Sequence, residues 1–111
     1  MIKEIKDGDK VLAIVIFDKF KHEGVHFVTP NSYSQQLAYM AHPKGKVIPP
    51  HVHNLVKREI HLTQEVLVLK KGKLRVDFYS DEKSYLKSIV IEKGDVILIS
   101  SGGHGFEVLE D

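Results

Sequence analysis

Short apolar runs separated by turn residues are the feature of this sequence that most restricts its fold. Runs of four to eight residues recur at intervals of about ten, with Gly, Pro, Asn, Asp and Ser between them. This spacing is typical of an all-β sandwich or barrel, and helical periodicity is poor throughout. The predicted strands, in chain order, are Val11–Phe17, Val25–Val28, Gln36–Ala41, Val47–Val52, Leu62–Leu69, Lys73–Tyr79, Lys87–Ile91, Val96–Ser100 and Gly105–Leu109.

The predicted strands are of two kinds. Lys73–Tyr79 alternates between apolar and polar residues, which predicts one buried and one wet face. By contrast, Val11–Phe17, Glu65–Leu69 and Val96–Ile99 are apolar on both faces and need cover on both sides. A small barrel covers only its inner face, and no helix is predicted that could cover the outer one. We therefore expect a second copy of the chain to do so, in a homodimer.

Composition bounds the possible functions. With 111 residues, we expect one domain spanning 1–111. Sixteen basic against 15 acidic residues give a net charge of +1, which argues against nucleic acid or a membrane surface as partner. The absence of cysteine excludes disulfides, cysteine-based zinc sites and cysteine nucleophiles. The charged first residues carry no apolar signal core, so we expect a cytoplasmic protein.

Histidine is the unusual residue of this chain: there are seven, four of them between His42 and His61. His51 and His53 stand at positions i and i+2 of a predicted strand and should project from the same face. Two adjacent imidazoles suit two ligands of one metal ion. The alternative interpretation is a pair of surface histidines next to two prolines.

A carboxylate and a further histidine extend this pair. Glu65 begins an otherwise apolar strand and shares its face with Leu67, where a buried carboxylate would need a partner. His104 is bracketed by glycines, which let the backbone bend sharply and pass close to another group. The alternatives are a solvated strand-end glutamate and an ordinary turn. Together with His51 and His53 they form a three-histidine, one-carboxylate set, which suits Fe, Mn, Ni, Cu, Zn or Co rather than Ca or Mg.

The order and spacing of these residues resemble the two motifs of the cupin superfamily. The first motif is matched by Gly45, His51, His53, Glu65 and Gly72, and the second by Gly94, Ser100, Gly102 and His104. The resemblance covers about residues 36–109. It implies a jelly-roll β-barrel, the cupin double-stranded β-helix, with one divalent transition metal held by His51, His53, Glu65 and His104. It also implies a small polar ligand or substrate in the barrel, with sugar or nucleotide-sugar compounds suggested by similar short cupin-fold metalloproteins.

The sequence departs from the cupin pattern in two places. Eleven residues, Asn54–Gln64, separate the second histidine from Glu65, where the family has a much shorter connection. We expect this loop at the mouth of the barrel. Further candidates at the rim are Glu59, as the alternative carboxylate ligand, with His61, Arg58 and Tyr39. In the second motif, Ser100 replaces the usual proline and His104 comes one residue early.

The resemblance does not select a reaction, because its superfamily carries many. Three functions therefore stay open. The first is a mononuclear metalloprotein that binds or transforms a small polar molecule. The second is a non-catalytic binding or sensor barrel, and the third is a metal-free sugar-nucleotide isomerase in which a histidine acts as base.

Overall fold

The computed structural model describes all 111 residues and contains strands, turns and irregular segments but no helix. The prediction of an all-β chain is confirmed. No segment forms a helix that could cross a membrane. The strands are β1 (Ile2–Asp7), β2 (Lys10–Ile16), β3 (Gly24–Phe27), β4 (Ala38–Ala41), β5 (Glu65–Val68), β6 (Lys73–Tyr79), β7 (Tyr85–Glu92), β8 (Val96–Ile99) and β9 (Gly103–Glu110).

The chain divides into two compact units. Unit 1 comprises Met1–Phe20 and Leu62–Asp111, and unit 2 comprises Lys21–His61. Unit 1 contains β1, β2 and β5 to β9, whereas unit 2 contains only the β3–β4 hairpin. The expectation of a single domain over 1–111 stays a prediction.

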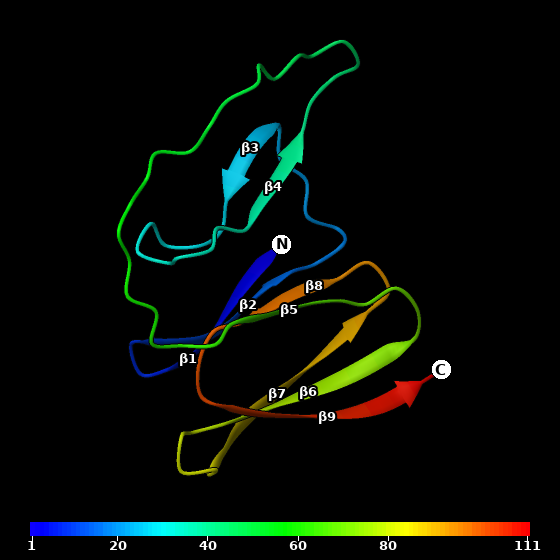
Figure 1. Ribbon diagram of the computed structural model, residues 1–111. Helices are drawn as coiled ribbons and strands as arrows, with labels where there is room; N and C mark the ends of the chain where they lie inside the picture. The colour runs from blue at the N-terminus through cyan, green and yellow to red at the C-terminus, as the bar shows by residue number, and fades with distance from the viewer. The chain divides into compact units, whose positions relative to one another are not determined.

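Unit 1 is built from two antiparallel sheets. One has the strand order β1-β2-β8-β5 and the other β7-β6-β9, so that β8 lies between β2 and β5 and β6 between β7 and β9 (Figure 1). Neither sheet closes on itself into a barrel. Val15 and Ile97 of the first sheet and Val76 and Phe78 of the second are almost completely buried and belong to one apolar cluster. The two sheets therefore share a core in the manner of a β-sandwich.

Strand β2 is buried on both of its faces within one chain. Leu12 to Ile16 are each no more than 8% exposed, although successive residues point to opposite faces. Leu12 to Ile16 are therefore already out of water within one chain, so the need for cover does not by itself argue for a second copy at these five residues. On β5, in contrast, Val66 and Val68 are about half exposed, at 44% and 55%.

Strand β1 was missed by the pattern of apolar residues. Its isoleucines, Ile2 and Ile5, are three positions apart, whereas a regular strand repeats every two. In the regular part of the pairing with β2, Ile2 lies opposite Ile16 and Ile5 opposite Ala13, so the two isoleucines project from opposite faces and neither face of β1 shows an apolar repeat. Ile5 is buried at 2% exposure and most of the other β1 residues are exposed. The signal that could have located β1 is the turn-forming Asp-Gly pair at Asp7 before the apolar run.

Unit 2 is a short hairpin followed by an irregular segment. Thr29 closes the hairpin loop: its hydroxyl donates to Oε1 of Gln36 at 2.7 Å and accepts from the backbone N–H of Leu37 at 3.0 Å. The strand predicted at Val47–Val52 is wrong, because no strand forms between Ala41 and Glu65. Pro49 and Pro50 supply the physical reason, since neither has an N–H to donate to a strand ladder.

Candidate functional site

Strand register places Glu65 and His104 on the inner faces of the two sheets of unit 1. Glu65 pairs with Ile99, and His104 pairs with Phe78, both of which belong to the shared core. Directly paired residues of neighbouring strands project from the same face of a sheet. The inward orientation predicted for Glu65 is therefore confirmed, and His104 faces inward despite its early position in the second motif.

The two side chains meet across the sheets. Nε2 of His104 lies 3.4 Å from Oε1 of Glu65. The His104 side chain is 25% exposed and that of Glu65 is 54% exposed. The expected burial of the Glu65 carboxylate is wrong, because β5 is the edge strand of its sheet and leaves one side of Glu65 open. Burial therefore gives no reason for this carboxylate to need a partner.

The surroundings of His104 fix which of its nitrogens is available. Its ring lies edge-on to that of Phe106, with centroids 5.4 Å apart. Nδ1 is buried and has no hydrogen-bonding partner among the protein's groups. A buried polar nitrogen without a partner costs about 1–3 kcal/mol. Nε2, on the side of Glu65, is therefore the atom that can bind a ligand.

The segment before β9 packs against β2, and this contact restricts which residues can stand at positions 100 and 102. The N–H of Ser100 donates to the carbonyl of Leu12 at 2.8 Å, a hydrogen bond that a proline could not make. At Gly102 the backbone has φ of 76°, and a Cβ there would lie 2.8 Å from Cδ2 of Leu12. Glycine is therefore required where the chain passes over β2 and turns towards His104.

In unit 2, His51 and His53 form a second pair. Their rings are stacked, with centroids 5.7 Å apart and planes at 13°. The prediction that they lie side by side is confirmed, although the segment is not a strand. Nδ1 of His51 lies 3.0 Å from the carbonyl of Pro49, which fits an N–H donor there and leaves Nε2 of His51 free.

The alternative ligands and rim residues are also in unit 2. Oε2 of Glu59 lies 3.4 Å from Nε2 of His61, and both side chains are largely exposed. Arg58 is exposed in the irregular segment, which confirms the expected loop. Tyr39 lies in β4, paired with His26 of β3.

The separation of Glu65 and His104 fits two adjacent ligands of one metal ion. Zinc and similar ions hold imidazole nitrogen and carboxylate oxygen at about 2.1 Å, so ligands at a tetrahedral angle are roughly 3.4 Å apart. The observed 3.4 Å matches this value and is longer than most hydrogen bonds. Within neither unit do three or more His, Asp or Glu side chains form a group that could hold a metal ion. The structure thus brings the four predicted ligands together as two pairs, and the four-ligand site stays a prediction.

Sequence reasoning missed a hollow of about 250 Å³ that His104 also lines. Its other lining residues are Tyr79, Lys83 and Gly103, and we call it the Lys83 hollow. The ring of Tyr79 is held edge-on by Tyr85, with centroids 5.8 Å apart. No periodicity of apolar residues could have revealed it, because it depends on the conformation of the turn between β6 and β7.

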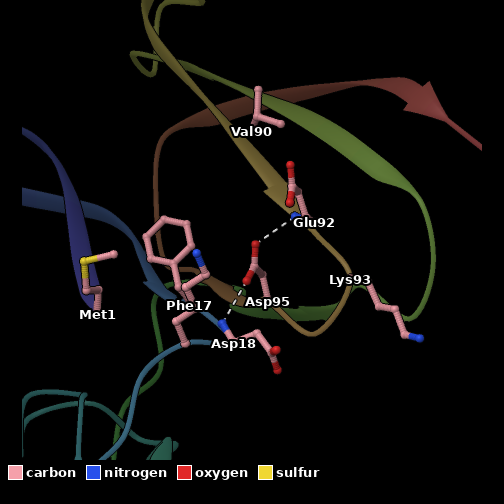
Figure 2. Close-up of a pocket in the computed structure, with 8 residues that line it drawn as sticks. Met1, Phe17, Asp18, Val90, Glu92, Lys93 and Asp95 are labelled. Atoms are coloured by element: carbon pink, nitrogen blue, oxygen red, sulfur yellow. Dashed lines mark hydrogen bonds between the residues drawn. The ribbon is translucent and has the colours of Figure 1, made fainter.

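A second pocket lies at the opposite end of β8 and has a structural carboxylate (Figure 2). Its volume is about 320 Å³, and its lining includes Phe17, Val90 and Asp95. Asp95 is only 6% exposed, and its two oxygens accept backbone hydrogen bonds from Asp18 at 2.8 Å and from Glu92 at 2.7 Å. The carboxylate therefore joins the end of β2 to the β7–β8 turn and is not available to a ligand.

A charged network lies on the outer face of the β7-β6-β9 sheet. Arg75 donates two hydrogen bonds to the Asp77 carboxylate, of 2.9 and 3.2 Å, and the Ser88 hydroxyl donates a third at 2.5 Å. The hydrogen bonds from Arg75, followed by that from Ser88, lower the pKa of Asp77 below its ordinary value of 3.8. Asp77 lies on the polar face predicted for this strand, but its side chain is only 12% exposed. The network stabilises the sheet and leaves its carboxylate fully occupied.

Comparison of the chain with profiles of known protein families, with curated proteins and with solved structures found no match.

Proposed function

We propose that the protein binds one divalent transition metal through His51, His53, Glu65 and His104 and uses it to bind or transform a small polar molecule. As part of this proposal, the two sheets of unit 1 belong to a jelly-roll barrel of the cupin type. The ligand set combines neutral imidazoles with one carboxylate, a combination preferred by first-row transition metals.

One observation carries this proposal: Glu65 and His104 come from different sheets, 39 positions apart, and meet at the spacing of two metal ligands. An ordinary ion pair would favour a shorter, better aligned contact. The stacked His51–His53 pair supports it, since Nε2 of His51 is free while its Nδ1 is held by a backbone carbonyl. Such an outer partner is typical of metal-binding histidines.

When bound, the metal would polarise a carbonyl or lower the pKa of a coordinated water. The chain's own residues then have separate tasks. Glu65 supplies the negative charge that offsets the cation, and the three imidazoles orient it. Phe106 packs against the ring of His104 and limits its rotation.

The test is metal content and zinc affinity of single variants. We expect His51→Ala, His104→Ala and Glu65→Gln each to lower zinc affinity by at least tenfold, because each removes one ligand. His22→Ala and His42→Ala are matched controls outside the set and should leave binding unchanged. Elemental analysis after purification without nickel resin gives the stoichiometry, and calorimetric zinc titration gives the affinity.

The choice of carboxylate is tested separately. Glu59→Gln should retain zinc binding, since Glu59 is exposed and paired with His61. Loss of zinc in Glu59→Gln together with retention in Glu65→Gln would show that Glu59 is the ligand. An equal loss in all variants, including the two controls, would reveal adventitious surface binding and refute the site.

We also propose a homodimer formed through the outer face of β5. Val66 and Val68 are the apolar side chains of that face and are about half exposed. Val68→Lys should shift the mass measured by light scattering from two chains to one. A wild-type mass of 12.6 kDa at all concentrations would exclude the dimer.

A further inference from the structure

The segment between β4 and β5 exposes most of its large apolar side chains. Residues 42–61, which we call the connecting segment, contain no strand. Val52 is 94% exposed and Leu55 is fully exposed, and the same holds to a lesser degree for Val47 at 75%, Ile60 at 68% and Val56 at 61%. A monomeric protein rarely leaves so many apolar side chains of one segment in water. The connecting segment is therefore typical of a contact surface.

Unit 1 leaves one side of its core open. β5 and β9 are edge strands of their two sheets, and the contact between Glu65 and His104 places these edges opposite each other. Phe106 and Val108 of β9 pair with core-facing residues of β6, so they point towards the core. They are nevertheless 45% and 70% exposed. We call this region the open side; each of its two edge strands also has one row of backbone groups that no strand pairs with.

The connecting segment and unit 1 carry opposite net charges. The connecting segment contains Lys44, Lys46, Lys57 and Arg58 against Glu59, a net charge of +3. Unit 1 contains 11 basic and 13 acidic residues, a net charge of −2. Opposite charges favour the encounter of two surfaces, whereas two copies of the connecting segment would repel each other. The connecting segment therefore matches unit 1 better than it matches a copy of itself.

Each of the two surfaces also carries half of the proposed metal site. His51 and His53 lie in the connecting segment with stacked rings, and Nε2 of His51 is free. Glu65 and His104 lie at the open side, with Oε1 and Nε2 3.4 Å apart. Within one unit, neither pair belongs to a group of three or more possible ligands. A contact between the two surfaces would thus also complete the ligand set.

From these observations we infer that two copies of the chain exchange their connecting segments, so that His51 and His53 of the partner subunit complete the metal site at Glu65 and His104. A single chain leaves both surfaces exposed, and a twofold dimer would cover each of them twice. The inference rests on the proposed function for the metal, and it names a second copy of the chain as the partner. The outer face of β5, proposed above as a dimer surface, belongs to the same edge strand, so that one dimer would use both.

The experiment combines two variants that each lack half of the site. His51→Ala/His53→Ala removes the ligands of the connecting segment, and Glu65→Gln/His104→Ala removes those of the open side. Each double variant alone should bind zinc at least about a hundredfold more weakly than the wild type, because two ligands are missing. The two variants are then unfolded in urea, mixed in equal amounts and refolded together, and zinc binding is measured by calorimetry.

The expected stoichiometry follows from random pairing of the chains. About half of the refolded dimers contain one chain of each kind, and each mixed dimer has one intact site out of two. The mixture should therefore bind zinc with wild-type affinity at about a quarter of the wild-type stoichiometry. His22→Ala refolded with His42→Ala is the control and should show the full wild-type stoichiometry. If the wild type binds zinc and the mixture of double variants does not, each chain completes its own site and the inference is overturned.

A second measurement tests the contact between the copies without metal. In chelator-treated protein, Leu55→Lys and Val108→Lys each place a charge on one of the two surfaces and should weaken the dimer at least about tenfold in sedimentation equilibrium. Val90→Lys changes a valine on the outer face of β7 that is 42% exposed, and it should have no effect. Equal effects of the three substitutions overturn the inference, and so does a wild type that is monomeric at all concentrations.

Failure of the two proposals can be told apart. If the wild type binds no zinc, the proposed function fails, whereas selective weakening of the dimer by Leu55→Lys and Val108→Lys still supports the exchange of segments. A monomer that sediments with phosphatidylglycerol vesicles, and loses this property in Leu55→Lys, would assign the connecting segment to a membrane surface and overturn the inference.

Discussion

Replacing Asp95 with alanine should destabilise unit 1. The carboxylate is 6% exposed and accepts two backbone hydrogen bonds, of 2.8 and 2.7 Å. Hydrogen bonds to a charged group contribute about 1.5–3 kcal/mol each, and the variant also leaves two N–H groups without acceptors. Allowing for partial access of water to these groups, we expect a loss of about 3 kcal/mol.

The loss can be read from urea unfolding followed by circular dichroism of the sheets. For a slope of about 2 kcal/mol per molar urea, the midpoint should fall by about 1.5 M. Asp95→Asn keeps one acceptor oxygen and should lie about halfway between wild type and Asp95→Ala. Glu92→Ala is the control, because its carboxylate is 64% exposed and makes only a 3.5 Å ion pair with Lys73.

The reasoning is refuted by a midpoint shift in Asp95→Ala no larger than that in Glu92→Ala. Such a result would mean that solvent replaces both hydrogen bonds at no cost and that the β7–β8 turn does not depend on them. A large change in slope would instead indicate a change in what unfolds, and the comparison would then need the free energies at one urea concentration.

Two further predictions test backbone strain and pH dependence. Gly94→Ala places a Cβ 2.5 Å from Oδ1 of Asp18 at φ of 92°, whereas the Cβ of Gly8→Ala, at φ of 59°, meets nothing within 4 Å. Thermal unfolding should show that Gly8→Ala lowers the free energy of unfolding by about 1–2 kcal/mol. Gly94→Ala should lower it by at least about 1 kcal/mol more. Equal losses would show that Asp18 moves aside freely. Because Arg75 lowers the pKa of Asp77, the stabilisation by this carboxylate is complete above pH 3.8 and is lost as the pH falls through the lowered value. The melting temperature of Asp77→Asn should therefore lie below that of the wild type at pH 5–8 and approach it below pH 3.8; a difference that persists at pH 2 would contradict the assignment.

The strands that the sequence predicted best are those with a regular pattern and no proline. Lys73–Tyr79 was predicted with its observed bounds, because its apolar side chains alternate and its partners lie on both sides. The strand predicted at Val47–Val52 was wrong because its apolar residues resemble a strand, whereas Pro49 and Pro50 have no N–H groups to donate to a ladder. Ile2–Asp7 was missed because its two isoleucines, Ile2 and Ile5, lie on opposite faces of the strand, so neither face carries a repeated apolar position.

For the candidate site, residue identity was easier to predict than environment. The inward direction of Glu65 follows from strand parity, which is local information. The exposure of Glu65 depends on β5 being an edge strand, and the order of strands in a sheet cannot be predicted from a short stretch of sequence. The Lys83 hollow could not be predicted from the sequence either, because it is lined in part by a turn residue, Lys83, whose positive φ is uncommon for lysine.

The order of strands in the larger sheet also sets the order in which the chain can fold. Ile16 of β2 pairs with Val96 of β8, 80 positions later in the sequence. At a synthesis rate of about 5–20 residues per second, β2 is complete some 4–16 seconds before that partner exists. During this interval only β1 can pair with β2, across the turn at Gly8, and it covers one edge of this apolar strand with charged side chains such as Lys3 and Glu4. We therefore expect the β1–β2 hairpin to form during synthesis and its charged edge strand to prevent pairing with other chains. Replacing those charged side chains with neutral ones should cause aggregation of newly made protein before it lowers the melting temperature of the folded protein.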